Sequence, residues 1–104
     1  MILVTSENIS GKQIIETLGL VKGEVVQSKH IGNDFIAGIQ TIVGGEIDGY
    51  TDMISEARNI ATKRMIAEAE KLGANAIIGV RYSSSAVMQG ASEILAYGTA
   101  VKIQ

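Results

Sequence analysis

Apolar residues recur every three or four positions between Thr51 and Leu72, and this spacing predicts one long helix. Lys71 in the last turn and Gly73 just after it are typical signals for the end of a helix. The predicted core face is a seam whose first half is dominated by small side chains: Ile54, Ala57, Ala61, Met65, Ala69 and Leu72. A second apolar edge lies on the helix flank and is formed by Met53, Ile60 and Ala67. One sheet cannot cover both edges, so we expect a neighbouring subunit to contact the helix.

Extended segments are predicted on both sides of this helix. Ile2–Thr5 is a short β-branched run, whereas Gln13–Leu18 is compatible with either a helical turn or extended chain. Leu20–Ile31 has apolar residues in both strand phases, which indicates a strand covered on two faces. Gly23 in its middle predicts a bulge or a bend. After the helix, Ala74–Ser83 contains a continuous apolar run that is typical of a buried strand.

The end of the chain predicts a hairpin, with Ser83–Gly90 as its loop and Ala91–Ile103 as the last strand. In that strand, we expect the odd positions to face the core: Leu95, Tyr97, Val101 and Ile103. The even positions carry mostly small residues: Ile94, Ala96, Gly98 and Ala100. Such a face permits close backbone approach, as in the interior of a subunit ring or under another strand.

A short helix is predicted before the long one, followed by a glycine-rich acidic connector at Gly44–Gly49. The predicted order is therefore strand, strand, short helix, long helix, strand, strand. This order favours an α+β fold of two layers, in which a mostly antiparallel sheet is packed by one long helix. A length of 104 residues predicts a single domain spanning 1–104.

Composition changes this picture by pointing to assembly. Apolar residues make up 46% of the chain and charged residues only 19%, which is a large apolar excess for a small domain to bury alone. No uncharged apolar run reaches the roughly 18 residues of a membrane span. We therefore expect a homo-oligomer that buries the excess between its subunits.

Charge and cysteine content exclude several classes of partner. The net charge is −2 without any basic run, so we expect no binding to nucleic acid or to a membrane. There is no cysteine, which excludes disulfides, thiolate metal sites and thiol nucleophiles. The first residues lack the basic and apolar regions of a secretory signal, so we predict a cytoplasmic protein.

Candidate metal donors are few. His30, Glu46 and Asp48 are the donors that a ring could bring together in several copies. Carboxylates suit magnesium or calcium better than heavy metals, and the alternatives are a surface histidine and helix-capping acids. Gly44 and Gly45 precede the long helix, where free backbone amides could bind a small ligand. The alternative there is a plain connector, because neither glycine belongs to a phosphate-binding motif.

No catalytic constellation is found, so we do not predict an enzyme. Ser83–Ser85 and the distant His30 do not place a base against a nucleophile, and a polar hairpin loop explains the serines. Arg64 and Glu68 are spaced for an ion pair on the helix surface, with Arg58 on the other margin of the seam.

A family resemblance extends over the whole chain. It is carried by TIVGGEIDGYTDMISEARNIATKRMIAEAEKLGANAIIGVRY and then MQGASEILAYGTAV. In these stretches the chain resembles the YbjQ-type family of small uncharacterised bacterial proteins, which are labelled heavy-metal-binding. The resemblance implies a dodecin-like β-α-β-β subunit that assembles into a ring, namely a pentamer. It also implies a ligand-binding or metal-binding module, with a metal ion as the cofactor to consider. The alternative is a structural or regulatory interaction module without a bound ligand.

Overall fold

The computed structural model describes residues 1–28 and 50–104, and within them the chain forms one helix and a sheet of four strands. In chain order the elements are β1 (Ile2–Leu3), β2 (Ile14–Ser28), α2 (Tyr50–Lys71), β3 (Ala76–Met88) and β4 (Ala91–Ile103). The predicted first strand, long helix and last strand are confirmed. Gln13–Leu18, for which the sequence allows a helical turn or extended chain, is extended from Ile14 and forms the start of β2. The predicted short helix and the connector Gly44–Gly49 lie outside the described residues.

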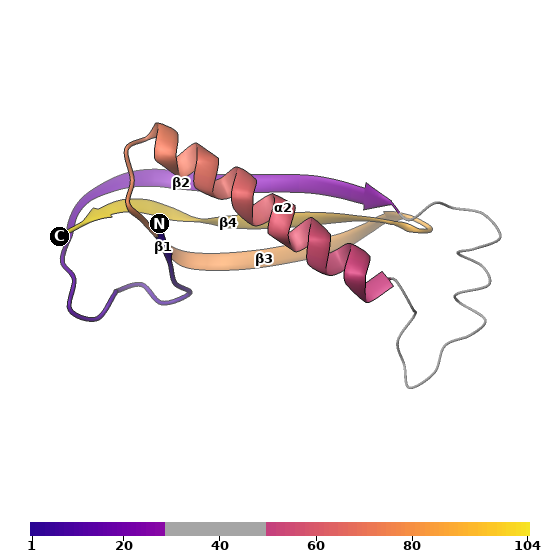
Figure 1. Cartoon of the computed structure of the whole chain (residues 1–104), viewed down its shortest axis with the longest axis horizontal. Coiled ribbons are helices and arrows are strands. Elements are labelled where there is room, and N and C mark those ends of the chain that lie inside the picture. The colour runs from indigo at the N-terminus through magenta and orange to yellow at the C-terminus, as the bar shows by residue number, and fades with distance from the viewer. Residues whose placement is uncertain (29–49) are drawn as a thin grey trace.

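The sheet has the order β1-β3-β4-β2, and α2 crosses one of its faces diagonally (Figure 1). Both β2 and β3 run antiparallel to β4, whereas the short β1 pairs with β3 in parallel. Because α2 connects β2 to β3 and β4 lies between them, the described elements form a β-α-β unit with an inserted strand. The predicted α+β class is confirmed, and the parallel pair makes the sheet mixed rather than purely antiparallel.

The helix packs through the small residues of the predicted seam. Four of its members are fully buried in the core: Ala57, Ala61, Met65 and Ala69. Ile54 is half-buried and packs against the same cluster, whereas Leu72 is exposed, so the contact ends before Leu72. The flank residue Met53 is buried within the subunit itself, whereas Ala67 is exposed. Small side chains at the contact allow the helix axis to approach the sheet closely.

Gly23 marks the point of closest approach between α2 and β2. A Cβ atom on Gly23 would lie 2.0 Å from the carbonyl oxygen of Ala61 and 2.5 Å from the backbone nitrogen of Met65. The pairing of β2 with β4 is regular through this position, so of the two predicted alternatives at Gly23, a bulge or a bend, the bulge is wrong. The register of β2 shifts nearer its start, between Ile14 and Gly19. A glycine is needed at position 23 because the helix backbone occupies the space of a side chain.

The two faces of β4 are reversed over its first part relative to the prediction. The even residues Ile94, Ala96 and Ala100 belong to the core cluster that the helix covers, and a Cβ atom on Gly98 would meet Ile77 and Val80 of β3. Leu95 is half-buried and Tyr97 is 36% exposed on the opposite face. Val101 and Ile103 are buried as predicted, in a second cluster with Ala76 that Ile9, Ile14 and Ile78 cover. The close approach of the helix accounts for the small residue at position 96, since Ala96 pairs with Gly23, where α2 lies closest to the sheet.

The C-terminal end of α2 is capped by Gly73, as predicted. Gly73 has a φ of +83°, its amide donates to the carbonyl of Glu70 (3.0 Å), and the amide of Ala74 donates to the carbonyl of Ala69 (3.1 Å). This pair of hydrogen bonds is a Schellman motif, which satisfies carbonyl groups at the helix end. The motif turns the chain directly into β3.

The predicted loop at Ser83–Gly90 is wrong for most of its length. β3 continues through the three serines to Met88, which pairs with Ala91 of β4. Only Gln89 and Gly90 connect the two strands, and Gly90 has a positive φ of +78°. A run of polar side chains favours a turn, although in a strand that is exposed at the sheet edge such residues are equally compatible with extended structure.

Candidate functional site

All candidate residues singled out for ligand binding lie outside the described part of the chain. These are the potential metal donors His30, Glu46 and Asp48, and the glycines Gly44 and Gly45. The structure therefore describes the helix that follows them, which begins at Tyr50, and not the candidate site itself. The prediction for these residues stays a prediction.

The described residues do not fit a metal ion. Across residues 1–28 and 50–104, no group of three or more His, Cys, Asp or Glu side chains lies close enough together to hold one. Glu68 binds the backbone instead, because its Oε1 accepts a hydrogen bond from the amide of Lys22 (3.3 Å). Glu16 and Glu24 contact Lys102 and Lys22.

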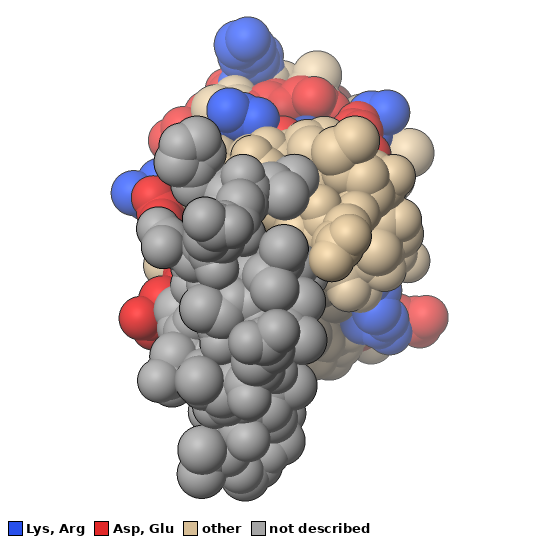
Figure 2. Space-filling model, turned by 90° about the vertical axis from the view of Figure 1, so that its right-hand side faces the viewer, with Lys and Arg blue, Asp and Glu red and all other residues tan. Residues whose placement is uncertain are grey.

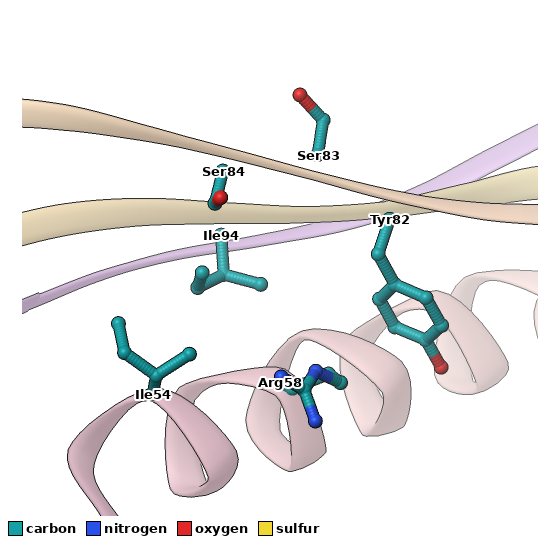
Figure 3. Close-up of a pocket in the computed structure, with 6 residues that line it drawn as sticks. All are labelled: Ile54, Arg58, Tyr82, Ser83, Ser84 and Ile94. Atoms are coloured by element: carbon teal, nitrogen blue, oxygen red, sulfur yellow. The ribbon is translucent and has the colours of Figure 1, made fainter. Parts of the chain in front are cut away.

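The described residues instead form a cleft of about 110 Å³ between α2 and the β3–β4 hairpin. Ile54 and Arg58 line it from one turn of the helix, and Ile94 lines it from β4. β3 contributes three consecutive residues, Tyr82, Ser83 and Ser84. In Figure 3, Ile54 and Ile94 point toward each other, and Tyr82 points from the sheet toward the helix. The side chain of Ser83 points away from the helix. The cleft is thus apolar between helix and sheet and polar along one side.

Hydrogen bonds tie the wall of the cleft to the helix. The hydroxyls of Tyr82 and Thr62 are 2.9 Å apart, and the Thr62 hydroxyl donates to the carbonyl oxygen of Arg58 at 2.7 Å. A threonine hydroxyl has one hydrogen, so the Tyr82 hydroxyl is the donor to Thr62. This chain of contacts fixes the tyrosine ring against the helical turn that carries Arg58.

The cleft was not anticipated from the sequence. The sequence predicts an ion pair of Arg64 and Glu68 on one margin of the helix seam, Arg58 on the other margin, and the three serines in a hairpin loop. That ion pair is not formed: Arg64 donates to the backbone carbonyl of Glu24 on β2, and Glu68 accepts from the amide of Lys22. The available signal was the spacing of Ile54 and Arg58 by four residues, which places both on one helix face.

A second candidate surface is the outer edge of β3. Near its start, this edge is covered by the N-terminal segment: the amides of Gly79 and Val80 donate to the carbonyls of Ser6 (2.9 Å) and Val4 (3.0 Å). The Arg81 guanidinium donates to the carbonyl of Thr5 (2.8 Å). Beyond this point, no described strand pairs with the edge formed by Tyr82–Met88. We call this segment the open edge.

The open edge lacks the features that normally protect a strand from pairing. Residues 82–92 contain no charged residue and no proline. Val87 and Met88 are more than half exposed. Figure 2, which views the molecule from the end where the hairpin lies, shows a broad uncharged area of the described surface with charged residues at its margins. Unprotected edges of this kind pair with other strands.

The other edge strand, β2, is protected. Lys22 and Glu24 contact each other through their side chains (3.4 Å), and Glu68 and Arg64 of α2 bind the amide of Lys22 and the carbonyl of Glu24. The helix therefore covers part of this edge with charged side chains. Within residues 1–28 and 50–104 the two edges therefore differ, because side chains of α2 contact the edge of β2 and no described strand pairs with the open edge of β3.

The sheet face opposite the helix carries further exposed apolar residues. Leu20 is 70% exposed and Val26 is 59% exposed, and both alternate with residues that point toward the helix. Tyr97 lies on the same face across from Lys22. The predicted two-sided covering of this strand is therefore not found within the described residues. In the same part of the chain, no helix is both long enough and apolar enough to cross a membrane.

Comparison with known proteins places the whole chain in a known group. A family model described as "Putative heavy-metal-binding" matches residues 1–104. A UPF0145 protein of Pseudothermotoga lettingae is 62% identical over 104 residues, which is 100% of this chain and 98% of the relative. A UPF0145 protein of Photobacterium profundum is 60% identical over 103 residues, which is 99% of this chain and 100% of the relative.

A solved structure has the same fold. It is a crystal structure of a protein of unknown function from Pediococcus pentosaceus, assigned to the DUF74 family. The TM-score is 0.63 and the sequences are 18% identical, with 100% of this chain and 98% of the other chain covered. At this level of identity the likeness concerns the fold alone.

Proposed function

The chain belongs to the YbjQ family, and on that premise we propose that it is a cytoplasmic binding module that assembles into a homopentameric ring. The observation that carries the assembly is the open edge of β3, which is uncharged, exposed and unpaired among the described residues. Pairing this edge with a second copy of the chain would satisfy its backbone groups. The ring and the subunit number are taken from the family resemblance, as is the dodecin-like arrangement of the subunit.

Exposed apolar side chains support the same proposal. Leu20 and Val26 on the open sheet face, and Met88 at the hairpin, are the kind of residues that subunit interfaces bury. A lone subunit would leave them in water. We assign no reaction to the module, and we propose neither nucleic acid nor membrane as its partner, since its net charge is only −2.

The mass of the protein in solution tests the assembly. We expect light scattering after size-exclusion chromatography to give five times the subunit mass of 11.0 kDa. Ser85→Lys places a charge on the open edge and should shift the mass toward a single subunit, because a desolvated lysine opposes strand pairing. Asn59→Lys adds the same charge on the exposed surface of α2 and should leave the mass unchanged. A wild-type protein that elutes as a monomer would refute the proposal.

A second candidate function is metal binding, favoured by the description of the matching family model. His30, Glu46 and Asp48 are the proposed donors, repeated in each subunit of the ring, with Gly44 and Gly45 as backbone contacts for a small ligand. Elemental analysis and calorimetric titration with zinc, copper and calcium, on protein without a polyhistidine tag, test this candidate. The absence of both bound metal and titration heat would leave an interaction module without a ligand.

A further inference from the structure

We infer that the cleft between α2 and the β3–β4 hairpin binds small carboxylates that carry a short apolar tail. This inference rests on the proposed role as a binding module, and it names the ligand class and the residues that would recognise it. It does not depend on the ring, because one subunit supplies all six residues that line the cleft.

The cation of the site is Arg58. Among the described residues, its guanidinium has no hydrogen-bond or ion-pair partner, whereas Arg64 and Arg81 both donate to backbone carbonyls. None of the six residues that line the cleft is acidic, so no carboxylate of the lining competes for the guanidinium. The planar, forked donors of arginine match a carboxylate through two parallel hydrogen bonds. Arg58 is therefore the group that would hold the anionic end of a ligand.

The hydroxyl groups beside Arg58 have different roles. Tyr82 uses its hydrogen to bind Thr62, so it shapes the wall of the cleft and is a positioning residue. Ser84 lines the cleft from the same strand, two residues further on, and therefore lies on the same face of the sheet as Tyr82. Its hydroxyl makes no hydrogen bond with any described residue. Ser84 is thus available to donate a hydrogen bond to a bound carboxylate.

The apolar part of the cleft distinguishes a carboxylate with a tail from an inorganic anion. Ile54 and Ile94 face each other between helix and sheet, and Ile94 is 3% exposed (Figure 3). Both side chains belong to the packing of the core, Ile94 within it and Ile54 against it, so they form the apolar end of the cleft. Phosphate would add no apolar contact there, whereas a short alkyl chain would extend this packing. A dry cavity of about 150 Å³ holds one benzene molecule. The cleft of about 110 Å³ therefore fits a tail of only a few carbons, with the carboxylate at the mouth.

Titration of the full-length protein with acetate, propionate and butyrate tests the inference, read out by calorimetry and by amide shifts of residues 54–58 and 82–84 in NMR spectra. We expect butyrate to bind with a Kd on the order of 1 mM, as is typical of a ligand this small. Each added methylene should tighten binding about fourfold, because it transfers apolar surface from water to the cleft. Inorganic phosphate and butylamine should bind at least tenfold more weakly than butyrate.

Matched variants identify the residues responsible. Arg58→Gln should weaken butyrate binding at least tenfold, and Ser84→Ala severalfold. Lys63→Gln removes the same charge from the same helix at an exposed position outside the cleft, and it should change binding less than twofold. Circular dichroism checks that each variant is folded. Equal binding by Arg58→Gln and wild type, or equal affinity for acetate and butyrate, would overturn the inference.

The two proposals fail separately. A ring of the expected mass that binds none of the carboxylates would refute the cleft proposal and leave the assembly intact. A monomer that binds butyrate through Arg58 would refute the assembly and support the cleft.

Discussion

At the scale of single residues, Gly23 shows how one position sets the distance between the two layers. The backbone of α2 at Ala61 and Met65 occupies the space that a side chain at position 23 would need. Intrinsic preference alone would predict a gain of about 0.5–1 kcal/mol for alanine over glycine inside a strand. The contact geometry predicts the opposite sign, because the overlapping atoms belong to a helix backbone that cannot rotate out of the way.

Gly23→Ala should therefore lower the free energy of unfolding by about 3 kcal/mol, the upper range for overpacking a core. Urea unfolding at a fixed protein concentration measures the change. Glu24→Ala is the matched control, because Glu24 is exposed on the same strand and its side chain forms an ion pair with the exposed Lys22. We expect the control to lose no more than about 0.5 kcal/mol. A neutral or stabilising Gly23→Ala would show that the helix can move.

At the scale of elements, the link between α2 and β3 depends on the left-handed backbone of Gly73. The space around a Cβ atom at this position is open, with Lys102 Cε at an ordinary distance of 3.7 Å. Any effect of substitution therefore reports backbone strain and not a clash. This separates Gly73 from Gly23, although the two glycines look alike in the sequence.

Gly73→Ala should cost about 1–2 kcal/mol in the free energy of unfolding, which is the penalty of a left-handed conformation for an L-residue. Gly73→Asn should cost less, since asparagine adopts this conformation more readily. Thermal unfolding followed by circular dichroism compares the two variants. Equal losses for alanine and asparagine would contradict the assignment of the Schellman motif as the cause.

The protection of the β2 edge also depends on two elements, because side chains of α2 bind backbone groups of β2. Glu68→Ala removes the acceptor for the Lys22 amide and should weaken local structure by about 1 kcal/mol, the net value of a typical hydrogen bond. Hydrogen exchange at the Lys22 amide should accelerate accordingly. Glu70→Ala, an exposed acid on the same helix, is the control and should leave that amide unchanged. Unaltered exchange in Glu68→Ala would show that the contact does not protect the edge.

At the scale of the whole molecule, self-assembly would make stability depend on concentration. If the native state is a ring and the unfolded state is a single chain, mass action raises the melting temperature as protein concentration increases. Calorimetric scans over a hundredfold range of concentration measure this. Ser85→Lys should melt at a temperature that does not change with concentration. A wild-type melting temperature that is constant over the range would argue against an obligate assembly.

The parts of the fold that the sequence predicts well are those set by local signals. The spacing of apolar residues predicts the long helix and the strand Ala91–Ile103, and Gly73 predicts where the helix ends. The structure confirms these three elements of the prediction. The α+β class follows from the order of these elements. The apolar excess indicates surfaces to be buried, although it does not say where on the molecule they lie.

Only the tertiary structure decides which face of β4 meets the helix, because both faces carry apolar residues and the choice depends on the closeness of α2 at Gly23. The cleft is equally a tertiary feature, since Arg58 and Ser84 belong to different elements and become neighbours only when the helix crosses the sheet. The sequence by itself determined the long helix, the end of that helix and the last strand, and that the chain has apolar surface to spare, but not that β3 continues through the three serines. Packing decided where that surface and the cleft lie, because side-chain neighbours across layers are set by contact distance and not by spacing along the chain.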